Sequence, residues 1–162
     1  MDDLDKLGLA TASAKARKSY REGGIPIGAA LVYHGSSLDL SNAVVLGCSH
    51  NQRIQKSSPT LHAEIATLED AGRLKADVYT KCTMYTTLSP CSMCTGAILL
   101  YKIPRVVIGE NKNFVGGEKL LKEHGVEVKV AGDTECEELM ARFIKEKPEV
   151  GKVHLYSTNY AR

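Results

Sequence analysis

Two cysteines separated by two residues follow a proline in the stretch LSPCSMCTGA, residues 88–97. Cys91 and Cys94 share one face if a helix begins there, as the small residues after Pro90 indicate. Such a pair is typical of a disulfide, a redox motif or part of a metal site. The chain has five cysteines and no apolar N-terminal run of the export type, so structural disulfides are disfavoured.

A second stretch, TLHAEIATLE at residues 60–69, narrows the choice. His62 and Glu64 are two residues apart, so on a regular helix they would not share a face. They can converge only on a point beyond the N-terminus of the helix that they open. We therefore expect two helix starts aimed at one spot, where the positive ends of both helices favour thiolates.

His62, Cys91 and Cys94 together would leave a tetrahedral zinc ion one ligand short, which is typical of a catalytic rather than a structural site. Zinc with two thiolates is formally neutral and therefore a weaker Lewis acid than zinc held by histidines. A nearby base is then needed to take a proton from water, and Glu64 is placed to do so. H-x-E followed by P-C-x-x-C is the signature of zinc deaminases.

The cysteine pair has two other interpretations. A thioredoxin-like redox pair also follows a strand, but here the proline precedes the cysteines and the HAE motif is left unexplained. A closed structural zinc site could take its fourth ligand from Cys48, His50 or Cys82, but it has no use for Glu64. The sequence therefore favours a metal-dependent aminohydrolase.

Composition sets broader limits. The 162 residues fit a single domain, residues 1–162, with 43% hydrophobic and 25% charged residues. The net charge of +2 argues against a nucleic-acid partner on electrostatic grounds, and the basic residues at 15, 17, 18 and 21 fit a solvated helix face. The chain has no apolar stretch long enough to span a membrane. We expect a cytoplasmic protein, with the nucleus as a second compartment.

Hydrophobic periodicity predicts alternating strands and helices. A first helix would carry an apolar stripe at Leu4, Leu7, Ala10, Ala14 and Tyr20 and end at Gly23. Strands are predicted at 27–33, 43–49, 83–88, 105–109 and 126–130, and further helices at 62–71, 92–101, 118–123 and 134–145. The first two strands would form an antiparallel hairpin, and the rest predicts an α/β fold with a mostly parallel sheet covered on both faces.

The sequence resembles the cytidine deaminase-like superfamily of zinc aminohydrolases, and within it the fungal cytosine deaminases, from about Gly23 to Pro148. The matching stretches are EGGIPIGAAL, HNQRIQK, TLHAEIATLE, GRL, MYTTLSPCSMCTGAI, IPRVVIGEN and NF. Bacterial tRNA adenosine deaminases share HAE and PCxMC, but YTTLSPC and GENKNF are more similar to the free-base enzymes. The resemblance implies a three-layer α/β/α sandwich with a five-stranded mixed sheet, and a homodimer.

Residue by residue, the resemblance implies one zinc ion per subunit on His62, Cys91 and Cys94, with Glu64 moving protons. It implies that Asn51 and the backbone N–H of Ala63 bind the carbonyl and amide edge of a base and that Phe114 stacks on the ring or flanks it. His50, Leu88 and Ser89 would complete the pocket. The implied reaction is hydrolysis of the ring amine, most simply cytosine to uracil with release of ammonia.

The match ends at the C-terminus. Fungal cytosine deaminases close the pocket with an acidic and aromatic segment, whereas here residues 148–162 form a divergent tail without acidic residues after Glu149. Ser92 replaces the usual aspartate, and the loop at 33–42 is longer than usual. Because the missing anchor would bind the substrate amine, other substrates stay open: another aminopyrimidine, a triazine or a purine base. A tRNA adenosine deaminase and a non-catalytic zinc-stabilised binding module are the remaining alternatives.

Overall fold

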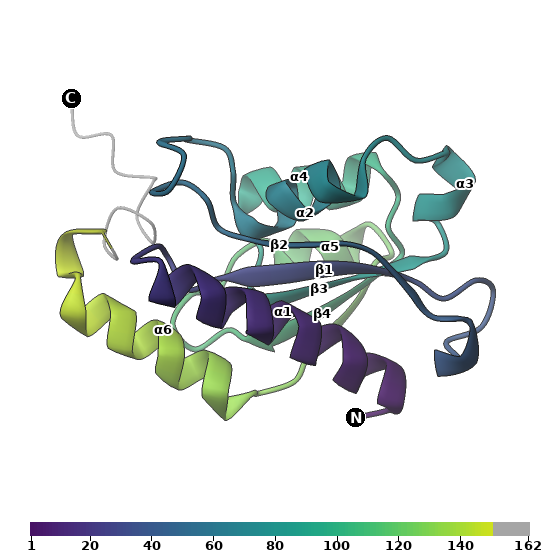
Figure 1. The fold of residues 1–162 in the computed structure, drawn as a ribbon. Coiled ribbons are helices and arrows are strands. Elements are labelled where there is room, and N and C mark those ends of the chain that lie inside the picture. The colour runs from purple at the N-terminus through teal and green to yellow at the C-terminus, as the bar shows by residue number, and fades with distance from the viewer. Residues whose placement is uncertain (151–162) are drawn as a thin grey trace.

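The computed structural model describes residues 1–150 and shows an α/β fold (Figure 1). Its elements in chain order are α1 (Asp3–Arg21), β1 (Gly28–Tyr33), the 3-10 helix η1 (Leu40–Asn42), β2 (Val44–His50), α2 (Ala63–Ala71), α3 (Ala76–Tyr79), β3 (Cys82–Leu88), α4 (Ser92–Leu100), β4 (Arg105–Glu110), α5 (Glu118–Glu123), β5 (Glu127–Val130) and α6 (Thr134–Glu146). The predicted helices and strands are all present, with bounds within a few residues of those expected. The short elements η1 and α3 were not predicted.

The five strands form one mixed sheet in the order β2-β1-β3-β4-β5. Strand β1 is antiparallel to both of its neighbours, β2 and β3, whereas β3, β4 and β5 pair in parallel. The predicted hairpin is therefore confirmed, and β1 is the single strand that runs against the other four. Because β2, β3 and β4 run in the same direction, their carboxyl ends meet at one edge of the sheet, where β1 begins.

Helices cover both faces of the sheet, which confirms the predicted three layers. Figure 1 shows α1 and α6 on one face and α2, α4 and α5 on the other. Alternate residues of β1 divide between two buried clusters: Leu31 packs in the cluster that contains Ala63 of α2 and Ile98 of α4, and Val32 packs in the cluster that contains Leu9 of α1. This alternation is the period-two pattern of a strand that is buried on both sides.

The buried face of α1 differs from the predicted apolar stripe. Of the predicted positions only Leu4 is buried, and the inner face is formed largely by small and polar residues: Leu4, Asp5, Gly8, Leu9, Ala12, Ser13, Ala16 and Ser19. A side chain on Gly8 would overlap the ring of Tyr85, so glycine lets the helix approach the sheet closely. Hydrophobicity alone did not identify this face because close approach and hydrogen bonding decide it.

A buried ion-pair network joins α1 to the sheet. Asp5 is fully buried and accepts hydrogen bonds from Arg105 at 2.6 and 3.1 Å, from Lys129 at 2.7 Å and from the hydroxyl of Tyr85 at 3.1 Å. Burial opposes ionisation of Asp5, but the hydrogen bonds from Arg105 and Lys129 outweigh it and hold the pKa of this carboxyl below its usual value. The network therefore links α1 to β3, β4 and β5.

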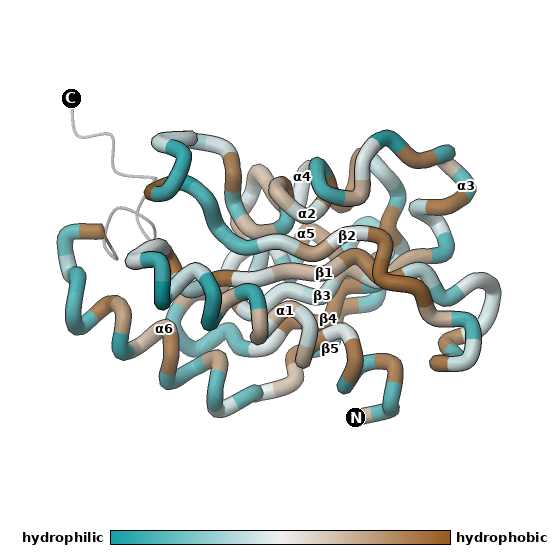
Figure 2. Tube along the Cα trace, viewed as in Figure 1, coloured by the Kyte–Doolittle hydropathy of each residue, from teal (hydrophilic) through white to brown (hydrophobic). Residues whose placement is uncertain are grey.

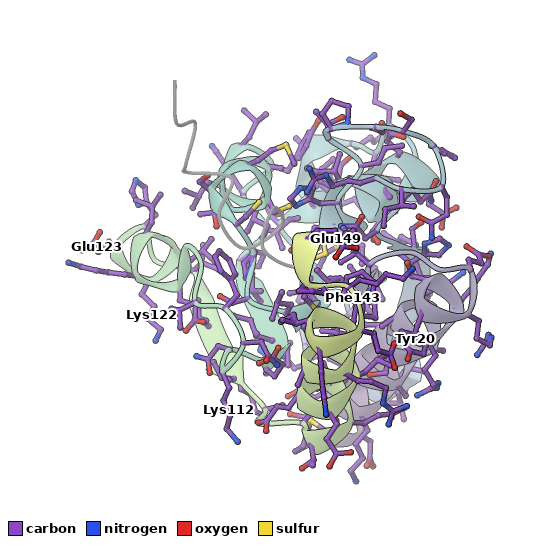
Figure 3. The ribbon with its side chains drawn as sticks, turned by 90° about the vertical axis from the view of Figure 1, so that its left-hand side faces the viewer. Tyr20, Lys112, Lys122, Glu123, Phe143 and Glu149 are labelled. Atoms are coloured by element: carbon purple, nitrogen blue, oxygen red, sulfur yellow. The ribbon has the colours of Figure 1, made fainter. Side chains whose placement is uncertain are left out.

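Helix α6 packs beside α1 through its apolar face. Figure 2 shows hydrophobic and hydrophilic residues alternating along α6, and Cys136, Met140 and Phe143 are its buried residues. In Figure 3, Tyr20 of α1 lies beside α6, and its hydroxyl donates to Glu146 at 2.7 Å. The ammonium of Lys147 donates to the carbonyl of Gly23 at 2.8 Å. These contacts hold the end of α6 against the end of α1.

Residues 151–162 lie outside the described part of the chain, so most of the divergent tail expected at 148–162 is not placed. Val150 still packs against the main hydrophobic cluster. Within residues 1–150, the helices are too short or too polar to cross a lipid bilayer.

Candidate active site

The predicted zinc ligands meet at the carboxyl edge of the sheet. His62 is the N-cap residue of α2, and Cys91 is the N-cap residue of α4, with Cys94 in the first turn of the same helix. One donor atom from each of the three residues lies within 4.8 Å of the others. Both helix starts therefore point at one spot, as the spacing of the two motifs predicts.

The donor atoms fit the dimensions of a zinc site. The Sγ atom of Cys91 lies 3.4 Å from Nδ1 of His62 and 3.6 Å from Sγ of Cys94. A tetrahedral zinc ion, with Zn–S near 2.3 Å and Zn–N near 2.0 Å, would set these separations at about 3.5 Å and about 3.8 Å. One imidazole and two thiols leave the fourth position for water or substrate.

The electrostatics of the cysteine pair also suit a cation. The hydrogen bond with Cys94 lowers the pKa of Cys91 to about 3, with burial opposing the shift and His62 assisting it. The same hydrogen bond, together with burial, raises the pKa of Cys94. A divalent cation between the two sulfurs would displace their protons and stabilise both thiolates.

Glu64 lies in the first turn of α2 and is only 4% exposed. Burial raises the pKa of its carboxyl, and the nearby charge of Cys91 raises it further. A carboxyl with a raised pKa holds a proton more readily than an exposed carboxyl does, which suits a group that must accept a proton and then donate it. The structure thus places a suitable proton carrier beside the candidate zinc ligands.

A small cavity opens onto this cluster at the edge where β2, β3 and β4 end. It is lined by Ile27, Asn51, His62, Glu64, Leu88, Ser89, Cys91 and Phe114. Asn51 follows β2, Leu88 ends β3 and Phe114 lies in the loop after β4. Residues far apart in the sequence, including four of the predicted substrate-binding residues, therefore surround one space.

Ile27 was not predicted to line the site. It precedes β1 and belongs to the stretch GGIPIG, in which its hydrophobicity alone indicated a strand residue. Only the direction of β1, which starts where its neighbours end, brings Ile27 to the cavity. The GGIPIG stretch could have pointed to this residue only through its similarity to the matching stretch of the fungal cytosine deaminases.

Asn51 carries an unused donor at the cavity. Its side chain is fully buried, and Oδ1 accepts the backbone N–H of Arg53 at 3.1 Å. Its Nδ2 atom has no hydrogen-bond partner within residues 1–150. A buried amide without a partner is costly, so this group is suited to a ligand that brings an acceptor.

The two remaining predicted binding residues differ in their placement. The ring of His50 does not line the cavity: Nδ1 lies 2.9 Å from the carbonyl oxygen of Asn51, and Nε2 lies 3.4 Å from the carboxylate of Glu22. His50 therefore contacts the backbone that carries Asn51. Ala63 is buried as the first residue of α2, where a backbone N–H has no acceptor within its own helix.

Comparison with known proteins agrees with this geometry. Residues 3–110 match the family model described as the cytidine and deoxycytidylate deaminase zinc-binding region. The chain is 59% identical to the cytosine deaminase of Candida albicans over 145 residues, which cover 90% of this chain and 92% of that protein. It is 32% identical to a tRNA-specific adenosine deaminase of Buchnera aphidicola over 161 residues, covering 93% and 94% of the two chains.

Solved structures share the same fold. A structure from a study of tRNA:A34 deaminases, which edit adenosine to inosine at the wobble position, aligns with a TM-score of 0.66 at 26% identity, covering 83% of this chain and 99% of the other. Guanine deaminase from Nitrosomonas europaea aligns with a TM-score of 0.66 at 20% identity, covering 83% and 81%. The family model over residues 3–110 and the 59% identity to a cytosine deaminase establish that the chain belongs to the cytidine and deoxycytidylate deaminase family and is a zinc-dependent hydrolytic deaminase.

Proposed function

We propose that the protein hydrolyses free cytosine to uracil and ammonia. The observation that carries the proposal is the 59% identity to a cytosine deaminase over 90% of the chain. The lining of the cavity supports it, because the apolar side chains of Ile27, Leu88 and Phe114 are of the kind that packs against a planar heterocycle.

His62, Cys91 and Cys94 would hold the zinc ion through Nδ1 and the two Sγ atoms. When bound, zinc supplies the Lewis acidity that lowers the pKa of a water molecule for attack on the amine-bearing carbon. The positive ends of α2 and α4 favour the two thiolates, because both helices begin at the ligands.

Glu64 would carry two protons in turn. Its carboxylate first takes a proton from the attacking water and gives it to the ring nitrogen beside the amine-bearing carbon. It then takes the proton of the newly added hydroxyl and gives it to the leaving amine. The C–N bond breaks, ammonia departs and Glu64 returns to its ionised form. Its raised pKa suits both halves of this transfer.

Asn51 would bind the base by donating its free Nδ2–H to the ring carbonyl, and the backbone N–H of Ala63 would add a second donor. Phe114 would cover the face of the ring. His50 would act indirectly, by holding the backbone of Asn51. A base that lacks the ring carbonyl would leave the Asn51 amide unpaired, and this mismatch would select against it.

Ammonia release from a panel of free bases tests the proposal, with cytosine, adenine, guanine, a triazine and the nucleoside cytidine as substrates. We expect turnover of cytosine by the zinc-loaded protein and a loss of at least about 100-fold in kcat for Glu64→Gln, with one zinc per chain retained. Glu69→Gln is the matched control, because Glu69 is exposed on the same helix. Turnover of another base but not of cytosine would refute the substrate assignment and leave the chemistry intact.

A tRNA adenosine deaminase is the second candidate, favoured by the 32% identity to the Buchnera enzyme. Such an enzyme would bind structured RNA with affinity that falls steeply as salt rises. The net charge of +2 offers few contacts for RNA phosphates. Inosine formation in tRNA, without deamination of free cytosine, would favour this candidate over ours.

We also propose that the protein is a homodimer in the cytoplasm. An apolar groove on the outer side of α2, α3 and α4 supports the dimer, since Leu100 there is 73% exposed and Tyr101 is 40% exposed. The five cysteines are free, which suits a reducing compartment. Sedimentation of the wild-type protein and of Leu100→Glu would test the dimer, and imaging of a tagged protein would test the compartment.

A further inference from the structure

A second buried carboxylate lies beside the cavity but takes no part in the proposed chemistry. Glu118 is the first residue of α5 and is 8% exposed. Its Oε1 atom accepts the hydroxyl of Ser89 at 2.8 Å, and its two oxygens accept the side-chain amide of Asn111 at 3.1 and 3.3 Å. Glu118 therefore joins the segment after β3 to the start of the loop after β4.

The bond to Glu118 fixes the role of the Ser89 hydroxyl. An ionised carboxylate can only accept hydrogen bonds, so the hydroxyl proton of Ser89 must point at Glu118. The oxygen of Ser89 is then free to accept the backbone N–H of Gly116, which lies 2.9 Å away. Ser89 thus lines the cavity while its hydroxyl donates to Glu118 and accepts from Gly116, and it connects Glu118 to the loop of residues 111–117.

Phe114 lies in the middle of that loop, which closes tightly onto the residues after β3. The backbone N–H of Gly117 donates to the carbonyl of Pro90 at 2.8 Å. A side chain on Gly116 would overlap the same carbonyl, so only glycine permits the approach. The contacts through Glu118 anchor both ends of the loop, at Asn111 and at Gly116, with Phe114 between them.

A separate carboxylate, Glu110, supports only the first half of the loop. It accepts the backbone N–H groups of Lys112 and Asn113 at 2.7 and 3.0 Å and the side-chain amide of Asn113 at 3.0 Å. The second half of the loop has a backbone hydrogen bond, from Gly117 to the carbonyl of Pro90 at 2.8 Å, and its contact with a side chain runs through Ser89 to Glu118. Glu118 is therefore the carboxylate whose loss would loosen the loop beside Phe114, because it orients the Ser89 hydroxyl and holds Asn111.

We propose that Glu118 is a positioning residue that holds Phe114 against the substrate ring and so sets the affinity for the base. The proposal rests on the proposed function, because it assigns Phe114 to the ring of the substrate. The zinc-binding residues and Glu64 belong to α2 and α4 and make no contact with Glu118 through these hydrogen bonds. Loss of Glu118 should therefore weaken substrate binding more than it slows the chemical step.

The test compares Glu118→Ala, Glu118→Gln and the double variant Asn111→Asp/Glu118→Gln. The glutamine of Glu118→Gln still accepts from Ser89 but directs its NH₂ group at the NH₂ group of Asn111. The double variant reverses that pair, because the new glutamine amide then donates to the new aspartate and the negative charge is kept. Glu123→Gln is the control: Figure 3 shows Glu123 on the outer side of α5, where its carboxylate lies 3.8 Å from Lys119.

We expect KM for cytosine to rise about tenfold or more in Glu118→Ala, the effect of losing hydrogen bonds to a charged group, with kcat changed less than about threefold. Zinc content should stay at one ion per chain. Glu118→Gln should behave similarly, the double variant should recover most of the affinity, and Glu123→Gln should match the wild type. An unchanged KM in Glu118→Ala, or a double variant no better than Glu118→Gln, would overturn the proposal.

Hydrogen exchange of residues 111–117 measures the loop without any substrate. Faster exchange in Glu118→Ala that returns towards the wild-type rate in the double variant would support the positioning role, and unchanged exchange would overturn it. Parallel losses of kcat, zinc and thermal stability would show a merely structural role and would also overturn it. Failure of the wild-type protein to deaminate cytosine would instead refute the proposed function, and the exchange data would still decide whether Glu118 orders the loop.

Discussion

Replacing Asp5 with asparagine should destabilise the protein more than any other single change of charge on α1. Asp5 neutralises two cations at the sheet: Arg105, which is 6% exposed as a side chain, and Lys129, which is partly exposed. Asparagine has nearly the same shape but no charge. Within residues 1–150, Arg105 would keep only the ion pair with the exposed carboxylate of Glu127 at 2.9 Å.

The expected cost follows from the burial of this network. Removing one partner of a buried ion pair costs about 3–5 kcal/mol, because the other charge stays buried without compensation. The asparagine of the variant keeps one carbonyl oxygen for Arg105 or Tyr85, so we expect a loss of about 3 kcal/mol, at the lower end of that range. In a domain of this size that loss corresponds to a fall in Tm of about 6–12 °C.

Urea denaturation of the wild type and of Asp5→Asn measures the difference in their free energies of unfolding. Asp3→Asn is the control, because Asp3 is exposed two residues earlier and its ion pair is with the exposed Lys6, so its loss should hardly change the unfolding midpoint. A double variant, Asp5→Asn with Arg105→Met, should recover part of the lost stability, since it removes the uncompensated charge.

The pH dependence supplies an independent check. The pKa of Asp5 is lower in the folded protein than its value of about 3.9 in an unfolded chain. Its stabilisation is therefore fully present above that unfolded value and is lost as the pH falls through the folded pKa. The difference in free energy of unfolding between wild type and Asp5→Asn should stay constant from about pH 7 to about pH 5 and become smaller below about pH 4. If Asp5→Asn loses less than about 1 kcal/mol of unfolding free energy at neutral pH, or if its difference from the wild type does not become smaller in acid, that result refutes the argument.

Three other predictions follow from the same packing and site geometry. Gly8→Ala should lower the free energy of unfolding in urea by about 1–3 kcal/mol, because the added Cβ would overlap Tyr85. Gly96→Ala on α4 is the control: nothing lies within 4 Å of its added Cβ, so this variant should be as stable as the wild type or more stable. Equal effects of the two substitutions would contradict the packing argument. Cys94→Ser should lose stoichiometric zinc by metal analysis, and retention of one tightly bound ion would refute the ligand assignment. Chelation of zinc should lower Tm, and restored zinc should recover it, because the ion binds only the folded arrangement; an unchanged Tm would count against a zinc site in this fold.

The sequence alone predicted the parts of this protein that depend on local spacing. The strands, the hairpin and the helix at Glu118–Glu123 were predicted from periodicity, because the direction of the side chains repeats with a fixed period along a strand or a helix wherever the element lies. The candidate zinc ligands and Glu64 were predicted from donor chemistry, since few combinations of residues satisfy zinc and supply a base, and the structure brings the three ligands within 4.8 Å of one another. Asn51 and Phe114 followed only from the resemblance, because an isolated asparagine or phenylalanine has no distinctive pattern.

The tertiary structure decided what depends on the approach of distant segments. The inner face of α1 is set by the close packing of Gly8 on Tyr85 and by the ion pair of Asp5 with Arg105, residues 100 positions apart in the chain. Ile27 reaches the cavity because β1 runs against its neighbours, and Glu118 reaches Ser89 because the loop after β4 folds back on the segment after β3. Such contacts are determined by the direction of strands and by the space between elements, and neither is encoded in a local pattern of residues.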